Sequence, residues 1–179
     1  MAAVYVGMGS NIEPEFHIRA GLIALDQRFG PLRVSTVYAN PAVGFAGDEF
    51  YNLAVGFQTE WPVRTVAATL RDIEQLYRHR GDRSTPGPRA LDLDLLLYDD
   101  LVMHEKGLRI PRDKILHHAF VLKPLAEIAG ARRHPVVSKT FAELWAAFDS
   151  SQAKLTPVPL PFSAGEPLAR GEDAFWFHG

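Results

Sequence analysis

The chain contains no cysteine, and that single absence excludes several kinds of chemistry. A disulfide scaffold, a thiolate zinc site, an iron–sulfur cluster and a cysteine nucleophile all need thiols. The sequence also has no apolar run of about 20 residues, the length that spans a bilayer. Its first residues lack the basic and apolar regions of a signal peptide. We therefore expect a cytoplasmic protein that does not bind membranes.

An excess of charge of either sign is also missing. Nineteen lysines and arginines stand against 21 aspartates and glutamates, for a net charge of −2. No global positive field draws this chain to nucleic acid, so any anion site must be local. Apolar residues make up 47% and charged residues 22% of the 179 residues, which is typical of a globular domain with its own core.

The order of the predicted elements favours a ferredoxin-like fold. Apolar and β-branched runs predict four strands, over 4–8, 32–38, 50–57 and 90–98. Apolar residues at helical spacing predict one helix after the first strand and another after the third, carrying the stripes Ile18 to Phe29 and Val66 to Tyr77. This order matches the split βαβ arrangement. We expect an α+β, ferredoxin-like βαββαβ sandwich with additional C-terminal helices.

The C-terminal part changes character along its length. Thr140 and Glu143 form the pattern of a capping box in front of a last amphipathic helix. From Leu155 the chain becomes rich in proline and glycine, which favours an extended, loosely held tail. We expect a folded domain over 1–154 and a tail over 155–179, whose aromatic end at 175–177 could dock elsewhere.

Two aspartates stand out in the predicted fourth strand. In Leu91-Asp92-Leu93-Asp94-Leu95 the alternation sends the leucines to one face and both carboxylates to the other. Side chains two positions apart on a strand are about 6.6 Å apart. Such a pair can hold Mg²⁺, which prefers oxygen ligands and is often shared with substrate phosphates. The alternative is a half-buried strand with a solvated acidic face.

The residues before these aspartates favour the metal interpretation. Between Arg64 and Arg89 there are six arginines and only three acidic residues. Arginine binds phosphate oxygens with two hydrogen bonds and does not lose its proton. Arg71 and Arg78 can be explained as positive charges that interact favourably with the dipole at a helix C-terminus. This explanation does not apply to Arg89, which stands beside the aspartates. The segment therefore suggests a nucleoside polyphosphate site.

Two other patterns are discounted as sites. Gly7 and Gly9 with Ser10 and Asn11 lack the lysine of a phosphate-binding loop, so we interpret them as a tight strand-to-helix turn. His117 and His118 point apart on regular structure and have no evident third ligand, so we predict no zinc site.

The third predicted strand has an unusual free face. Phe50, Asn52 and Ala54 alternate with the apolar face of that strand, so an amide lies beside an aromatic ring. The long connections 39–49, before the third strand, and 78–89, after the second helix, are also candidates for function.

These motifs together resemble the 6-hydroxymethyl-7,8-dihydropterin pyrophosphokinase family. The segment 87–96, Gly-Pro-Arg-Ala-Leu-Asp-Leu-Asp-Leu-Leu, is similar to the signature of that family. Further segments agree in order, and the similarity runs from about Val4 to about Phe148. They are 9–11, 38–44, 51–55, 73–74, 119–122 and 124–125.

The resemblance implies an enzyme that transfers pyrophosphate from ATP to 6-hydroxymethyl-7,8-dihydropterin, releasing AMP, in folate biosynthesis. By position, Asp92 and Asp94 correspond to ligands of two Mg²⁺ ions, and Glu74, Arg89 and Leu95 to residues on the ATP side. The residues implied to act on the phosphates during transfer are Arg80, Arg83, Arg89, Arg112 and His118.

The resemblance also implies a pterin site. Asn52 corresponds to the amide that hydrogen-bonds the pterin, and Phe50 and Phe120 to two aromatic rings that stack on it. This agrees with the separate placement of Phe50 and Asn52 on one free face, which suits a flat heterocycle. Asn40, Pro41 and Val43 fall in the family's pterin-side loop.

Three departures bear on the activity. Pro86 replaces a common tryptophan, the basic loop 77–83 has a different spacing, and His118 stands where the family has an arginine. His118 can supply that charge only when protonated, and we expect nearby polyphosphate to raise its pKa above about 6.5; Arg112 could supply the charge instead. A catalytically weakened paralogue that binds pterin or nucleotide is therefore one alternative. An RNA-binding sheet is another, but it conflicts with the acidic face of the fourth strand.

Overall fold

The computed structural model describes residues 1–40, 49–78, 90–151 and 153–159, together with the backbone of 161–163, 166–167 and 175–177. The helices are α1 (Pro14–Phe29), α2 (Val63–Leu76), α3 (Lys114–His117), α4 (Ala119–Ala129) and α5 (Phe141–Ala147). The main-sheet strands are β1 (Ala2–Ser10), β2 (Leu32–Val34), β3 (Val37–Asn40), β4 (Phe50–Thr59), β5 (Asp92–Tyr98), β8 (Thr156–Val158) and β11 (Phe175–Phe177). Two small hairpins pair β6 (Met103–Glu105) with β7 (Leu108–Ile110), and β9 (Pro161–Ser163) with β10 (Glu166–Pro167).

The centre of the main sheet has the strand order β2-β4-β1-β5. All three pairings in this run are antiparallel. A helix follows β1 and a second helix follows β4, so the predicted ferredoxin-like α+β sandwich is confirmed.

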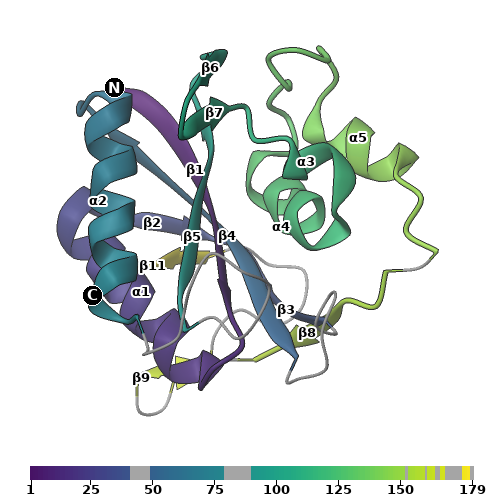
Figure 1. Cartoon of the computed structure of the whole chain (residues 1–179). Helices are drawn as coiled ribbons and strands as arrows, with labels where there is room; N and C mark the ends of the chain where they lie inside the picture. Colours follow the sequence, from purple (N-terminus) through teal and green to yellow (C-terminus); the bar gives the residue numbers. More distant parts are fainter. Residues whose placement is uncertain are drawn as a thin grey trace.

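Helices cover both faces of this sheet, and each face has its own core (Figure 1). Under α1 and α2, one core contains Ile18, Leu22, Leu70 and Ile73, as the helical spacing predicts. Under α4 and α5, the second core is smaller. Its fully buried side chains include Phe141, at the start of α5.

The predicted second strand, 32–38, is wrong as a single element, because the chain forms β2 and β3 with a break between them. The break is at Ser35 and Thr36. The Ser35 backbone N–H donates to the Ala54 carbonyl at 2.9 Å, and the Ser35 hydroxyl accepts from the Ala54 N–H at 2.8 Å. The side chain thus replaces a backbone acceptor, which lets the strand change direction without leaving a buried N–H unpaired.

β5 contains a β-bulge that the pattern of its sequence does not predict. Tyr5 pairs with Leu97 and Val6 pairs with Leu95, so Leu96 is an extra residue on β5. Leu93 and Leu95 enter the core under α1 and α2, as predicted, whereas Leu96 and Leu97 belong to the other core. The alternation therefore holds for the part of β5 that carries Asp92 and Asp94.

The C-terminal segments extend the sheet. β8 pairs with β3, and β11 pairs antiparallel with β2, where Trp176 lies opposite Arg33. The predicted docking of the aromatic end is therefore confirmed for its backbone. The predicted division between 1–154 and 155–179 stays a prediction.

The capping box of Thr140 and Glu143 is present at α5. Among the described residues, no helix has the length and apolar content needed to cross a membrane.

Candidate functional site

The first part of the site is an acidic cluster formed by Glu74, Asp92 and Asp94. Asp92 and Asp94 are partly buried on β5, with Leu93 and Leu95 turned into the core between and beside them. Glu74, from the end of α2, accepts a hydrogen bond from the Leu93 backbone N–H at 3.1 Å. The apolar stripe of α2 places Glu74 next to the buried Ile73, and this brings three carboxyl groups from two elements together.

The environment of Glu74 favours its protonated form. Burial is the main cause that raises its pKa, to about 8, and a hydrogen bond and like charge from Asp92 and like charge from Asp94 add to this. The N–H of Leu93 acts in the opposite direction. A cation at this cluster would remove the repulsion between these carboxylates.

We expect the titration of Glu74 to lower the stability of the metal-free protein at high pH. When folding raises the pKa of an acid, the protein loses stability as the pH rises from the pKa in the unfolded state to the pKa in the folded state. For Glu74 these pKa values are 4.5 and about 8. Near pH 9, Glu74→Gln should therefore be more stable than the wild type by about 1–3 kcal/mol, allowing for partial exposure.

Urea denaturation across this pH range, without divalent cations, measures the difference. Glu60→Gln is the matched control, because Glu60 is exposed next to the start of α2. A difference between Glu74→Gln and the wild type that does not change with pH would contradict the assignment.

Two cations flank the acidic cluster. The Lys114 ammonium lies 3.1 Å from Asp94 Oδ2, and the Arg112 guanidinium lies 4.0 Å from Asp94 Oδ1. Arg112 Nε also donates to the Leu95 carbonyl at 3.4 Å. Arg112 was among the predicted residues, but Lys114 was not. Its contact joins positions 20 residues apart in the sequence, and no local motif indicates it.

The surroundings of His118 favour its neutral form in the protein without nucleotide. Burial, followed by the positive charge of Lys114 and of His117, lowers its pKa below the ordinary 6.5. The expectation that bound polyphosphate raises the pKa of His118 concerns the protein with nucleotide, and it stays a prediction. The ring of His118 stacks on Phe120 instead, with ring centroids 4.9 Å apart and planes at 24°. The positively charged side chains near Asp94 are thus those of Arg112 and Lys114.

The second part of the site is an amide and aromatic surface on β3 and β4. Tyr38 lies opposite Asn52 and Asn40 lies opposite Phe50, so these four side chains share one face of the sheet. The Asn52 side-chain N–H donates to Asn40 Oδ1 at 2.6 Å. The predicted placement of Phe50 and Asn52 on one face is confirmed, but that face is not free, because Ala54 on it is buried in the second core. Phe120, partly buried at the start of α4, belongs to the core on that same face.

Gly9 joins the two parts of the site. It pairs with Asn52 on one side and with Asp92 on the other, so all three residues share one face. A Cβ at position 9 would lie 2.7 Å from Asn52 Oδ1. The interpretation of Gly7 and Gly9 as a tight turn is wrong, because both lie inside β1. Gly9 instead leaves room for the Asn52 amide.

We expect Gly9→Ala to displace the Asn52 amide and to disturb the face that carries it. Gly7→Ala is a matched control on the same strand, because the atoms nearest to its Cβ would be Leu96 carbons at 3.5 Å or more, an ordinary contact. If Asn52 binds a heterocycle, Gly9→Ala should weaken that binding about tenfold or more, the loss of about one hydrogen bond to a ligand. Calorimetric titration of both variants measures this, and equal binding by the two would contradict the role of Gly9.

The remaining predicted site residues are either buried or outside the described part of the chain. The side chain of Leu95 is buried in the core, so only its backbone can reach a ligand. Five residues lie outside the described part of the chain: Pro41, Val43, Arg80, Arg83 and Arg89. The same is true of most of the connections 39–49 and 78–89.

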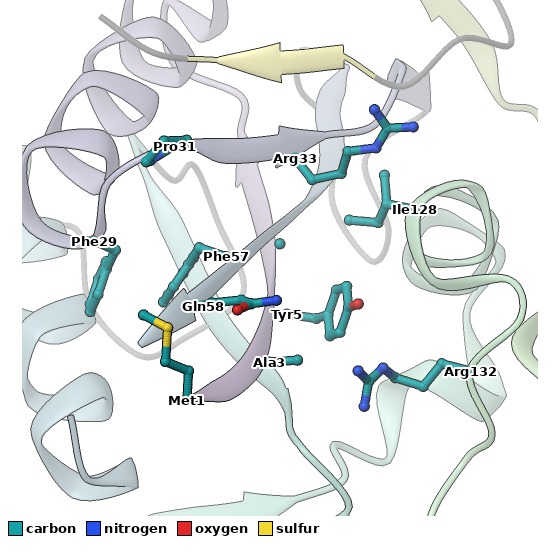
Figure 2. Close-up of a pocket in the computed structure, with 11 residues that line it drawn as sticks. Met1, Ala3, Tyr5, Phe29, Pro31, Arg33, Phe57, Gln58, Ile128 and Arg132 are labelled. Carbon is teal, nitrogen blue, oxygen red and sulfur yellow. The ribbon is translucent and has the colours of Figure 1, made fainter. Parts of the chain in front are cut away.

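The structure also has a cavity of about 460 Å³ (Figure 2). Ala3, Tyr5 and Phe57 line it, near the start of β1 and the end of β4, whereas Gly9, Asn52 and Asp92 lie at the opposite ends of these strands. The guanidinium of Arg132 lies over the Tyr5 ring, 5.5 Å from its centroid. None of the predicted site residues that the structure describes lines this cavity.

The fold and the site together define a class of protein. An acidic cluster with adjacent cations can hold a metal-bound phosphate group, and an amide with aromatic rings can hold a flat heterocycle. Gly9 sets these two surfaces side by side on a ferredoxin-like sheet. This arrangement suits a protein that brings a polyphosphate next to a small ring compound.

Comparison with known proteins identifies the family. Residues 5–130 match the model of the 7,8-dihydro-6-hydroxymethylpterin-pyrophosphokinase (HPPK) family. The chain therefore belongs to this family, and it is an enzyme of the transferase class. The resemblance deduced from the signature at 87–96 is confirmed.

Named relatives agree with this assignment. A 2-amino-4-hydroxy-6-hydroxymethyldihydropteridine pyrophosphokinase of Aquifex aeolicus is 31% identical over 80% of this chain and 90% of its own length. The protein of the same name from Synechocystis is 35% identical over 78% of this chain and 72% of its own length. The bifunctional protein FolKE of Lactococcus lactis is 31% identical over 80% of this chain but only 43% of its own length.

Solved structures support the fold. The wild-type HPPK-DHPS of Plasmodium falciparum with SDX-DHP matches 85% of this chain with a TM-score of 0.66 at 13% sequence identity. The chain spans 44% of the length of that protein.

Proposed function

We propose that the chain transfers the pyrophosphoryl group of ATP to the hydroxymethyl oxygen of 6-hydroxymethyl-7,8-dihydropterin and releases AMP, as a step of folate biosynthesis. One observation carries this proposal: Asn52 and Asp92 flank Gly9 on one face of three adjacent strands. Neighbouring strands are about 4.8 Å apart, so the two residues lie about 10 Å apart across β1. This spacing allows a pterin and a polyphosphate to lie next to each other.

The donor atoms of the acidic cluster fit Mg²⁺. Asp92 and Asp94 offer hard oxygen ligands beside Glu74. Within the described residues, no group of three His, Asp or Glu side chains converges closely enough to hold a metal ion alone. Mg²⁺ is usually held by one or two carboxylates together with substrate phosphates, which supports Mg²⁺ bound jointly with ATP. The number of two ions is proposed from the family resemblance alone. When bound, the metal neutralises the charge of the phosphates.

The chain's own cations complete the phosphate side. Arg112 and Lys114, both at Asp94, would supply positive charge to phosphates bound beside the acidic cluster. Arg80, Arg83 and Arg89 are proposed as further phosphate contacts from their positions in the sequence. His118, with its lowered pKa, is proposed to support the Phe120 ring rather than to carry charge.

The pterin side positions the attacking oxygen. We propose that the pterin ring stacks between Phe50 and Phe120 and that Asn52, held by Asn40, hydrogen-bonds its edge. Pro41 and Val43 are proposed to close over it. The hydroxymethyl oxygen then attacks the β-phosphorus, the bond from this phosphorus to the α,β-bridging oxygen breaks, and the hydroxyl proton passes to solvent. Positioning and charge neutralisation supply most of the catalysis in such transfers.

A coupled assay for AMP release tests this function. AMP should form only when ATP, Mg²⁺ and the pterin alcohol are all present, and EDTA should stop its formation. The weakened paralogue instead predicts pterin binding with no AMP release. The cytoplasmic location stays a prediction from the sequence.

A further inference from the structure

We propose that Glu127 is a positioning residue that sets Phe120 at the correct distance and angle from the Asn40–Asn52 amide pair. This inference rests on the proposed function, because it assigns Phe120 and Asn52 to the two sides of the pterin. Glu127 itself lies outside that site, about two helical turns beyond Phe120 on α4.

The Glu127 carboxylate joins α4 to the sheet. Its Oε2 accepts a hydrogen bond from the Thr36 backbone N–H at 2.9 Å, and its Oε1 accepts a hydrogen bond from the Tyr38 hydroxyl. Thr36 is 2% exposed and Tyr38 is 3% exposed. Both donors are therefore shielded from water. A buried donor without a hydrogen-bond partner destabilises the fold more than an exposed one does. The carboxylate thus connects α4 to the start of β3 and to the break before it.

The spacing along α4 puts this contact and Phe120 on one face of the helix. Phe120, Lys123 and Glu127 lie at positions i, i+3 and i+7, which face the same direction. The Lys123 ammonium lies 4.7 Å from the centroid of the Tyr38 ring. α4 therefore contacts Tyr38 twice, through Lys123 and Glu127, on the face that carries Phe120.

On the sheet side, Tyr38 leads directly to the amide pair. Tyr38 lies opposite Asn52 in the pairing of β3 with β4, and Asn40 lies two residues further along β3. Asn40 in turn accepts the hydrogen bond of the Asn52 amide at 2.6 Å. A shift of Tyr38 relative to α4 therefore changes the distance between the amide pair and Phe120.

The first turn of α4 needs such an anchor. Pro124 lies inside α4 and has no backbone N–H. The Phe120 carbonyl, four residues earlier, thus lacks the usual helical hydrogen bond. The place of Phe120 then depends more on how α4 packs against the sheet than on the backbone of its own turn.

Two conservative substitutions test the inference. Tyr38→Phe removes only the hydroxyl that donates to Glu127, and Glu127→Gln keeps the size of the side chain and one oxygen acceptor. Tyr98→Phe is the matched control, because its hydroxyl also donates a single hydrogen bond, to the Trp61 carbonyl at 2.7 Å. Tyr98 pairs with Val4, at the end of β1 opposite to Gly9.

We expect Tyr38→Phe and Glu127→Gln to weaken binding of 6-hydroxymethyl-7,8-dihydropterin about five- to tenfold, the scale of one lost hydrogen bond. The affinity for Mg-ATP and for a nonhydrolysable analogue should stay within about twofold of the wild type. The double variant should lose no more than the larger single loss, because both changes break one connection. Tyr98→Phe should bind both ligands as the wild type does.

The outcomes separate this inference from the proposed function. If Asn52→Ala weakens pterin binding while Tyr38→Phe and Glu127→Gln do not, the positioning role is overturned and the proposed function stands. If the two variants weaken pterin and Mg-ATP binding equally, the effect is one of general stability and the inference is also overturned. If neither the wild type nor Asn52→Ala binds the pterin, the proposed function itself fails.

Discussion

Asp92→Ala and Asp94→Ala should each lower the rate of AMP release about a thousandfold or more. Each substitution removes a carboxylate proposed to hold Mg²⁺ against the triphosphate, and metal binding contributes several kcal/mol to such transition states. The folded structure should persist, because both side chains lie on the face away from the leucines of β5.

Steady-state rates at saturating ATP, together with thermal unfolding, measure both effects. Asp72→Ala is the matched control, because Asp72 is exposed on α2, two residues before Glu74. It should retain the wild-type rate. Near wild-type turnover in Asp92→Ala or Asp94→Ala would remove the metal assignment, whereas unfolding of either variant would show that the acidic cluster supports the fold.

Phe120→Ala should weaken binding of the pterin far more than binding of ATP. Stacking acts on the flat ring and not on the triphosphate, and aromatic contacts contribute about 0.5–1.5 kcal/mol beyond burial. The substitution also removes the ring on which His118 stacks. Together these losses predict a pterin affinity lower by about tenfold or more.

Calorimetric titration with each ligand separates these effects. Phe148→Ala provides the comparison, because Phe148 packs on the same core and stacks on Trp145, at a centroid distance of 5.8 Å. It should lower stability without a selective effect on pterin. Equal losses for both ligands in Phe120→Ala would count against the stacking role.

The parts of the fold and site that follow from local pattern could be predicted from the sequence. The two-residue alternation of β4 separates Phe50 and Asn52 from the core under α1 and α2, and the same alternation in β5 separates Asp92 and Asp94 from Leu93 and Leu95. The signal is strong because a shift of one residue would turn these polar side chains into the larger core under α1 and α2.

The parts that depend on contacts between distant segments could not be predicted. Lys114 reaches Asp94 across 20 residues and Glu127 reaches Tyr38 across 89. The role of Gly9 depends on a side chain from a neighbouring strand. Nothing in the local sequence of these residues differs from that of an ordinary surface lysine, helix glutamate or strand glycine, because the information lies in the tertiary packing.

The central claim is that the group transferred is pyrophosphate and that its acceptor is the pterin alcohol. ³¹P NMR of a reaction of the wild-type protein with ATP, Mg²⁺ and 6-hydroxymethyl-7,8-dihydropterin tests it directly. We predict that AMP and a pterin diphosphate ester appear in equal amounts, and that neither appears when the alcohol is omitted. Formation of ADP with a pterin monophosphate, or AMP release that does not require the alcohol, would contradict the claim.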